Sequence, residues 1–470
     1  MSLAGNAYRD RMFDCPQNLR EEEMFEVPEW AANKVVYQIF PSRFAATEPV
    51  DKELWYKAPI TPMDDLHGNL RGIIEHMDDI QNLGIDVLYM TPIFQSNSCH
   101  KYDTTDYYQI DPSFGTTEDL KELVQKAHER GMKVVLDAVY NHTGREFFAF
   151  ADILENGEKS KYRDWYFIDG FPLKSEWGEI PNFKCFGYYG GMPKLNLKNP
   201  EVEKYITDVA CYWIKECDID GWRLDVGDEI SHFFWKNFRK AVKAVKKDLL
   251  IIGEIWHYAG DFLEGDEWDT VMNYPFYLNL IDLLADEKIT VSQFVQNLGY
   301  LKGRLHKNCY PLMWNLIDSH DTARFLHLCN DNKKKQHLAA AFQLLLPGMP
   351  MIYYGDEYAM PGANDPDCRR GMYWDEEYQD KEMYEWYKRL IQVRKSHACI
   401  VEGELAGSVT EDEEGTVVLI RKNGEETIAM IFNCSSSAKK FNEYTQKYNL
   451  LTENTFDGNV EGFDAAVIVL

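Results

Sequence analysis

The feature that most constrains the fold is a regular alternation of short, β-rich runs with longer amphipathic ones. This pattern is typical of parallel strands joined by crossover helices. Two of the intervening segments carry clear helix signals, because residues 116–131 start at a Thr cap and end at a Gly, and residues 199–216 open on Asn-Pro. The expected strands are residues 35–40, 86–93, 133–140, 221–226, 249–255, 270–275, 312–321 and 349–357. Eight strands predict a closed (β/α)8 TIM barrel rather than an open sheet.

Two segments do not fit this alternation. Residues 141–199 separate the third strand from its helix, and so long a connection indicates a functional lid or an inserted subdomain. Residues 415–434 are two alternating runs around Asn423-Gly424, which is a strong hairpin signal. We therefore expect an α/β chain with four parts: an N-terminal segment (1–34), the barrel (35–140 and 200–395), an inserted subdomain after the third strand (141–199) and a C-terminal antiparallel β domain (396–470).

The composition limits the class of partner. Acidic side chains number 77 and basic ones 50, which gives a formal net charge of −27. This balance disfavours nucleic acid, anionic membranes and strongly acidic substrates, so a neutral substrate fits better. Aromatic residues make up 14% of the chain. Their flat apolar rings suit sugar faces, although core packing is the expected role of most of them.

The targeting signals and the cysteines indicate a compartment. The first residues, MSLAGNAYRDRMFDCPQN, contain no apolar run of signal-peptide length, and no later stretch reaches the roughly 18 apolar residues of a spanning helix. Ten cysteines are scattered without a CxxC pair or a His/Cys cluster, which favours reduced structural thiols. We expect a cytoplasmic protein, and a leader removed from the mature chain stays an open alternative.

Acidic side chains follow three of the expected strands, where the active sites of such barrels lie. Asp225 ends the fourth strand, Glu254 the fifth and Asp321 the seventh. Three acids at one mouth suit glycosidic bond cleavage, in which one acid protonates the leaving oxygen and another attacks or activates water. Arg223 alternates with Asp225 and so points to the same side of the strand. Its positive charge is expected to keep that aspartate ionised.

Each of these residues also has a structural interpretation. A single Arg/Asp pair on a strand is more often a structural ion pair, and Asp137 suits the anchoring of a loop as well as contact with a substrate. His142 and His320, taken singly, are typical of hydrogen-bonded structural histidines. A divalent metal is a further alternative because oxygen-rich sites bind Mg²⁺ or Ca²⁺. However, Arg223 would repel a cation that shared Asp225.

Four motifs resemble the main signatures of the α-amylase superfamily of glycoside hydrolases, in that family's order and at suitable strand ends. They are DAVYNH (137–142), GWRLDV (221–226), GEIW (253–256) and LIDSHD (316–321). The resemblance extends over essentially the whole chain from about Val35. It implies that Asp225 is the nucleophile that forms a covalent glucosyl intermediate, Glu254 the general acid and then base, and Asp321 the transition-state stabiliser. Net retention follows if Asp225 and Glu254 stand about 5 to 5.5 Å apart.

The same resemblance implies which residues bind the sugar. His142, Arg223 and His320 correspond to ligands of the sugar at the cleavage site. The segment HKYDTTDYYQIDPSFGT is similar to the family's loop after the second strand. There, Tyr102 is expected to stack on the sugar ring, with His100 nearby.

Two further segments, MPKLN (192–196) and GANDPDCRRGMYW (362–374), resemble the neopullulanase, cyclomaltodextrinase and maltogenic amylase group. Asp365 and Arg369 match positions that bind the neighbouring glucose in that group. The resemblance implies hydrolysis of α-1,4 bonds in cyclodextrins, maltooligosaccharides or pullulan. An α-1,6-glucosidase or a glucosyltransferase of the same superfamily is the alternative. A non-catalytic carbohydrate-binding protein is a remote one.

The chain departs from that group at two places, its N-terminal part and the residues after Asp225. Members usually carry an N-terminal β domain that helps to build a dimer, whereas here the first barrel strand begins near Val35, so the oligomeric state stays open. Where the group more often has a small residue and Asn-Glu, this chain has Gly227-Asp228-Glu229. Glu229 is expected either to line the acceptor side or to cap a helix that begins at Ile230.

No cofactor is expected to be required. Calcium is common among amylases and Asn141 matches a ligand position, but a loop hydrogen-bonding role is favoured and no metal is predicted.

Overall fold

The computed structural model describes residues 26–174 and 180–470. Eight parallel strands follow the order β8-β7-β6-β5-β2-β1-β10-β9. A parallel bridge between Met272 and Trp314 joins the two ends, so the sheet closes. The strands are β1 (Val36–Ile39), β2 (Val87–Met90), β5 (Lys133–Ala138), β6 (Gly221–Leu224), β7 (Leu250–Gly253), β8 (Thr270–Val271), β9 (Trp314–Asn315) and β10 (Met349–Tyr353). The predicted barrel is confirmed.

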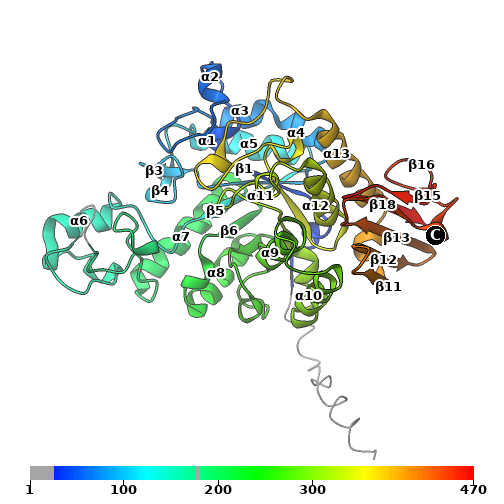
Figure 1. Ribbon diagram of the computed structural model, residues 1–470. Helices are drawn as coiled ribbons and strands as arrows, with labels where there is room; N and C mark the ends of the chain where they lie inside the picture. Colours follow the sequence, from blue (N-terminus) through cyan, green and yellow to red (C-terminus); the bar gives the residue numbers. More distant parts are fainter. Residues whose placement is uncertain (1–25, 175–179) are drawn as a thin grey trace, which may run out of the picture.

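Helices surround the barrel on its outside (Figure 1). The two helix predictions correspond to α5 and α7, and both begin where their caps predict. Thr116 and Asp119 form a capping box at the start of α5, and Asn199 caps α7 ahead of Pro200. The main helices are α3 (Leu70–Glu75), α4 (Met77–Leu83), α5 (Thr117–Glu129), α7 (Pro200–Cys217), α8 (His232–Val245), α9 (Tyr274–Leu280), α10 (Val291–Arg304), α12 (Lys333–Leu345) and α13 (Lys381–Ser396).

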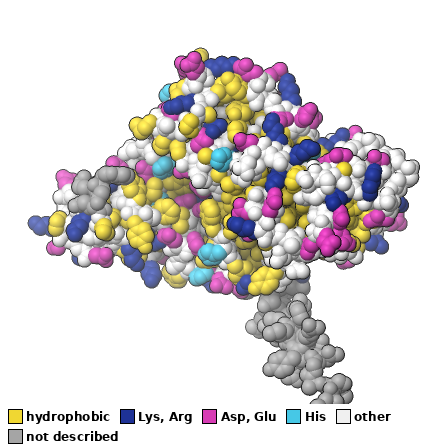
Figure 2. Space-filling view, viewed as in Figure 1, with side chains coloured by type: hydrophobic (Ala, Val, Ile, Leu, Met, Phe, Trp, Pro, Cys, Tyr) yellow, Lys and Arg dark blue, Asp and Glu magenta, His cyan; other side chains and the backbone are white. Residues whose placement is uncertain are grey.

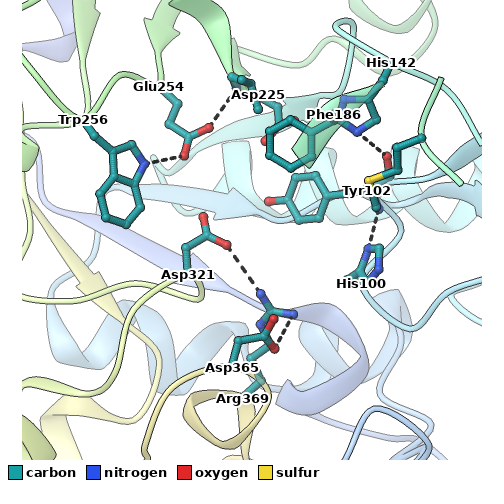
Figure 3. Close-up of a pocket in the computed structure, with 12 residues that line it drawn as sticks. His100, Tyr102, His142, Phe186, Asp225, Glu254, Trp256, Asp321, Asp365 and Arg369 are labelled. Carbon is teal, nitrogen blue, oxygen red and sulfur yellow. Dashed lines mark hydrogen bonds and ion pairs between the residues drawn. The ribbon is translucent and has the colours of Figure 1, made fainter. Parts of the chain in front are cut away.

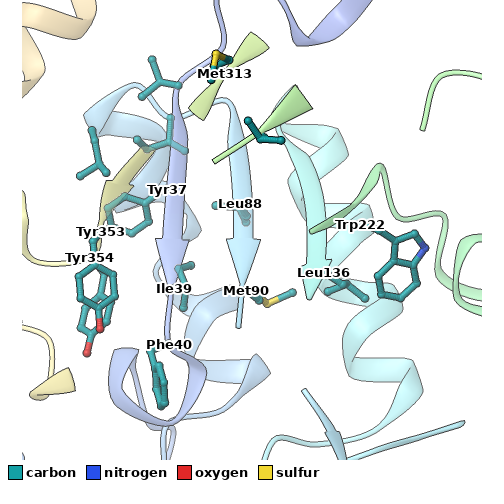
Figure 4. Packing of buried hydrophobic residues seen from close by; sticks show 14 of the residues in the cluster. Tyr37, Ile39, Phe40, Leu88, Met90, Leu136, Trp222, Met313, Tyr353 and Tyr354 are labelled. Carbon is teal, nitrogen blue, oxygen red and sulfur yellow. The ribbon is translucent and has the colours of Figure 1, made fainter. Parts of the chain in front are cut away.

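Alternate residues of the strands divide between the two sides of the barrel wall. Val36 and Val87 belong to a buried cluster with residues of the opposite strands, and this cluster fills the interior. Tyr37, Leu88 and Leu136 belong to the larger cluster that packs outward against the helices (Figure 4). Burial on both sides is expected for parallel strands covered by helices. The strands are therefore a rigid base for the residues that follow them.

Aspartates stabilise the amino-terminal end of the barrel, away from the expected site. Asp220, just before β6, accepts a hydrogen bond from the N–H of Val134 at 3.0 Å and pairs with Lys133 at 2.9 Å. Asp86 and Asp269 make the same kind of contact with the strand before their own. These side chains hold the register of neighbouring strands, which is the structural role expected at this end of a barrel.

Two appendages flank the barrel on opposite sides (Figure 1). The connection between β5 and α7 protrudes on one side and contains α6 (Phe148–Asn156) and the short turn η4 (Phe186–Tyr188). On the other side lies a six-stranded sheet. Its strands are β11 (Glu404–Glu411), β12 (Thr416–Asn423), β13 (Glu426–Asn433), β15 (Tyr448–Asn449), β16 (Asn454–Thr455) and β18 (Asp464–Val469). The predicted hairpin is the antiparallel β12–β13 pair. Phe432 of β13 stacks on Phe342 of α12 with ring centroids 4.2 Å apart, so the sheet is anchored to the barrel.

The described part of the chain has a surface of mixed charge and free thiols. Acidic and basic side chains are interspersed over the face shown in Figure 2. Among the described residues, no helix is long and apolar enough to cross a membrane, and nine cysteines carry free thiols. The N-terminal segment expected at 1–34 lies outside the described residues up to residue 25.

Candidate active site

One cavity of about 380 Å³ opens at the carboxyl ends of the barrel strands (Figure 3). Its walls come from segments that follow five strands, and from the inserted subdomain. The lining residues are His100, Tyr102, His142, Phe186, Met192, Asp225, Val226, Glu254, Trp256, Asp321, Asp365 and Arg369. Eight of the ten predicted site residues are among them, and Arg223 and His320 are not. Residues far apart in the sequence are therefore brought together around a single space.

Arg223 lies directly behind this cavity and is fully buried. Its neighbour Trp222 packs outward, so strand alternation turns Arg223 toward the interior, where its Nη1 lies 2.9 Å from Asp225 and 3.1 Å from Asp137. Its Nη2 lies 2.9 Å from Glu254 and 3.9 Å from Asp321. One guanidinium thus contacts four carboxyl groups, three of which line the cavity. Like charges this close favour retention of a proton within the cluster.

Burial and Arg223 act in opposite directions on these acids. Burial raises the pKa of Asp225 well above its ordinary value, and the attraction of Arg223 lowers it by less. Burial likewise raises the pKa of Asp321 and brings that of Asp137 to about 6, again against the attraction of Arg223. Arg223 was expected to keep Asp225 ionised, and it does lower the pKa of Asp225, but burial has the larger effect in the opposite direction. The arginine limits the cost of burying the carboxylate but does not cancel it.

Glu254 is held by the residue that follows Asp225. The N–H of Val226 donates to Oε2 of Glu254 at 2.8 Å, and the indole N–H of Trp256 donates to Oε1 at 3.1 Å. Val226 has a φ of 46°, which is rare for a β-branched residue. Such backbone strain costs about 1–3 kcal/mol and persists where the surroundings require it. The strained turn therefore fixes Asp225 and Glu254 relative to each other.

His320 was expected to contact the sugar, and the structure places it behind Tyr102, outside the residues that line the cavity. The side-chain amide of Gln38 lies 2.7 Å from Nδ1 of His320, and Nε2 contacts the hydroxyl of Tyr102. Burial lowers the pKa of His320 well below its ordinary value, so the ring is neutral. The Tyr102 hydroxyl donates to Asp137 at 3.0 Å. Asp137 is thus a buried support for Arg223 and Tyr102, and neither a loop anchor nor a wall of the cavity.

The other predicted residues complete the wall of the cavity. His100 and Tyr102 lie between β3 (Phe94–Ser96) and β4 (Thr104–Ile110). Nε2 of His142 lies 3.1 Å from the carbonyl oxygen of Tyr102, and burial lowers the pKa of His142 to about 4. Arg369 pairs with Asp365 at 2.9 Å and with Asp321 at 3.5 Å. These walls offer both neutral and charged hydrogen-bonding groups.

Four lining residues were missed: Phe186, Met192, Val226 and Trp256. Trp256 and Val226 stand next to predicted acids and could have been found from that position. Phe186 stacks on His142 with centroids 5.1 Å apart. Its place depends on backbone bridges within the insertion, such as Cys185 to Pro193. No local pattern reveals such long-range pairing.

Asn141 and Glu229 meet at a lysine. Nζ of Lys194 lies 2.6 Å from the amide oxygen of Asn141 and 2.8 Å from the Glu229 carboxylate. Helix α8 begins at His232 after Ser231, so the capping interpretation of Glu229 was wrong. Glu229 does not line the cavity either. In the described ranges, no group of three or more His, Cys, Asp or Glu side chains is arranged to hold a metal ion.

The closed barrel and its acid-lined cavity define a glycoside hydrolase of the barrel type. Residues 38–403 match the family model described as the catalytic domain of alpha amylase. The chain therefore belongs to the α-amylase family, and the resemblance inferred from the motifs is confirmed.

Two similar proteins carry names of the group that the motifs resemble. A cyclomaltodextrinase of Geobacillus thermopakistaniensis is 46% identical over 428 residues, covering 90% of this chain and 72% of that enzyme. Neopullulanase 2 of Thermoactinomyces vulgaris is 42% identical over 421 residues, covering 88% of this chain and 72% of that protein. A solved structure described as the cyclic α-maltosyl-(1→6)-maltose hydrolase of Arthrobacter globiformis matches with a TM-score of 0.86 and 35% identity, over 94% of this chain and 100% of that chain.

Proposed function

We propose that this α-glucan hydrolase cleaves α-1,4-glucosidic bonds of cyclodextrins, maltooligosaccharides or pullulan with net retention. The observation that carries the proposal is the pair of carboxyl groups, Asp225 and Glu254, each 2.9 Å from one buried guanidinium and both in the wall of one cavity. A retaining glycosidase needs two such groups on either side of the scissile bond.

The proposed reaction has two balanced steps. In the first, the Asp225 carboxylate attacks the anomeric carbon while Glu254 gives its proton to the glycosidic oxygen, so the C–O bond breaks and the leaving sugar departs as an alcohol. In the second, Glu254 takes a proton from water, and the resulting hydroxide displaces Asp225 from the anomeric carbon. Two inversions at one carbon give net retention.

Other residues of the wall bind the glucose ring in this proposal. Asp321 accepts hydrogen bonds from sugar hydroxyls, and these bonds strengthen as the ring flattens toward the transition state. The ring of Tyr102 provides an apolar face for stacking, with His100 and His142 beside it. Asp365 and Arg369 contact the neighbouring glucose, while Arg223 and His320 position Asp225 and Tyr102 from behind.

Product analysis tests this function. Incubation with a cyclodextrin, maltotriose and pullulan is expected to release maltose or glucose, and proton NMR should show the α-anomer first. An initial β-anomer would contradict the two-step mechanism. Absence of any hydrolysis of all three glucans would overturn the function.

Two observations favour a second candidate, an α-1,6-glucosidase or glucosyltransferase of the same family. The Arthrobacter structure whose description names an α-(1→6) linkage is matched over its whole chain. In addition, Trp256 at the cavity is 42% exposed and offers a face to an acceptor sugar. Incubation with maltotriose and excess glucose separates the candidates, since a transferase yields new linkages to the added glucose.

We also propose that no metal is needed at Asn141, because the ammonium group of Lys194 supplies a positive charge there. A chelator is therefore expected to leave both the melting temperature and kcat unchanged. The Glu229→Gln variant is the matched probe of the Lys194 contact and should lower the melting temperature alone. A loss of activity on chelation that calcium restores would contradict this.

A cytoplasmic location is part of the proposal. The free thiols of the described cysteines fit a reducing compartment. Cell fractionation with an assay on maltotriose checks it, and activity in a secreted fraction would contradict it.

A further inference from the structure

A second cavity, of about 370 Å³, lies outside the catalytic one and shares none of its lining residues. Three segments form it. The first runs from α1 (Pro41–Phe44) into α2 (Lys52–Trp55), the second is the junction of α3 and α4, and the third is the connection after β10. Its lining includes four aromatic side chains, which are Trp55, Tyr56, His76 and Trp374. A concave site rich in aromatic groups is a candidate binding site.

The two tryptophans are held at their polar ends. The indole N–H of Trp55 donates to the carbonyl oxygen of Met372 at 2.8 Å, and that of Trp374 donates to the carbonyl oxygen of Phe44. The Trp374 ring also stacks on His76 with centroids 3.6 Å apart. Rings fixed in this way lose little conformational entropy when a ligand binds, so the wall is preorganised.

Tyr56 is fixed at both its hydroxyl and its ring. Its hydroxyl oxygen accepts the N–H of Asp375 at 3.0 Å, and its ring stacks on Tyr378 with centroids 4.0 Å apart. This contact joins α2 to the connection after β10. The cavity is therefore built by tertiary contacts between distant segments and is not a gap beside one loop.

The charges around the cavity select against ionic ligands. Nζ of Lys52 lies 2.7 Å from Asp375 and also pairs with Glu377, so its charge is neutralised. Glu48 adds another acidic group to the lining, which disfavours anions. Lys52 also lies 5.9 Å from the centre of the Tyr56 ring, where a ligand cation would stack. A neutral molecule with hydroxyl groups and an apolar face fits best.

We propose that this second cavity is an auxiliary binding site for an α-glucan. Sugar rings present an apolar face to the aromatic rings and hydroxyl groups to Thr47, Glu48 and Asp375. The choice of an α-glucan among neutral sugars rests on the proposed function. Arg369 lines the catalytic cavity and Trp374 lines the second one, and five residues span at most about 18 Å. The auxiliary site thus holds a long glucan close to the place of cleavage.

Binding stoichiometry tests the auxiliary site directly. The Asp225→Asn protein, which does not consume its ligand, is titrated calorimetrically with β-cyclodextrin or maltoheptaose. Two equivalents are expected to bind. Adding Trp374→Ala should weaken one of them by roughly tenfold, because the aromatic ring that the sugar packs against is lost. Because Trp374 also contacts Phe44, Thr47→Arg is the second variant, which blocks the cavity from an exposed position and removes no ring.

Kinetics on the active enzyme gives an independent readout. In the Thr47→Arg and Trp374→Ala variants, KM for amylose should rise several-fold, while kcat/KM for maltotriose stays within about twofold of the parent. Tyr300→Ala is the matched control, since this exposed tyrosine of α10 lines neither cavity. It should change neither quantity.

The outcomes separate this proposal from the proposed function. A single equivalent in the Asp225→Asn protein, with maltotriose hydrolysis intact in the parent, refutes the auxiliary site alone. Two equivalents that survive both cavity variants refute its location. A self-association of the chain that Thr47→Arg abolishes, without any change in glucan binding, would assign the cavity to a second copy and overturn the proposal. Absence of hydrolysis of every glucan by the parent would instead refute the proposed function.

Discussion

Replacement of Asp225 by Asn is expected to lower kcat for maltotriose by at least about 10⁴-fold, the scale of losing a residue that acts within a catalytic unit. An amide cannot form the ester bond to the anomeric carbon. The fold should not suffer, because Asn has nearly the same shape and burial already disfavours the charged form of Asp225. The melting temperature is therefore expected to be equal to that of the parent or higher. Steady-state rates and thermal unfolding measure both effects.

Two further variants test whether the loss of activity is specific to the nucleophile. Asp137→Asn changes another buried carboxyl group beside Arg223, but this group does not line the cavity. Its effect on kcat should be smaller than that of Asp225→Asn. In Asp225→Ala, azide should enter the vacated space and displace fluoride from α-maltosyl fluoride, which gives a β-glycosyl azide. Activity of Asp225→Asn within tenfold of the parent would rule out the nucleophilic role.

The barrel could be predicted because its strands are short apolar runs between helices with clear caps. Each of the eight barrel strands lies inside its expected range, but each range was too long at one or both ends. The range expected for β6 extended two residues beyond its carboxyl end. The strand ends at Leu224, and Asp225 follows it. There the chain leaves the sheet and its side chains become available for chemistry. Local pattern and topology agree at these positions.

The acids of the site could be predicted for the same reason, since a closed barrel brings the carboxyl ends of its strands to one mouth. The contacts between them could not. Neither the four carboxyl groups around Arg223 nor the place of Asp137 behind Tyr102 follows from spacing. The direction of the pKa shift of Asp225 also depends on the depth of burial, and a sequence does not give that depth.

The contacts of the insertion and of the second cavity could not be predicted from the sequence, because they join distant segments. Phe186 reaches the active site through pairing within a long irregular connection. Trp374 meets His76 from the other end of the barrel sequence. Such aromatic contacts join segments that have no common periodicity. Only the backbone of the whole barrel brings them together.

Replacement of Glu254 by Gln is expected to lower kcat for maltotriose by about 10²–10⁴-fold, the usual contribution of a positioned general acid. Gln keeps an oxygen for the indole N–H of Trp256 and so preserves much of the local geometry. The fluoride of α-maltosyl fluoride leaves without a proton, so its release in the first turnover should remain within about tenfold of the parent. The second step lacks its base. A maltosyl adduct on Asp225 should therefore accumulate, detectable by mass spectrometry, and added azide should release it.

The comparison of substrates decides the role of Glu254 because the two leaving groups differ chiefly in their need for a proton. Trp256→Phe is the matched control, since it removes the N–H that contacts Glu254 but leaves the carboxyl group. It should reduce the rate on maltotriose by less than Glu254→Gln does, and azide should not rescue it. An equal loss of Glu254→Gln activity on maltotriose and on the fluoride would mean that Glu254 does not donate the proton. In that case the hydrogen bonds from Val226 and Trp256 position a carboxylate with a purely electrostatic part in the reaction.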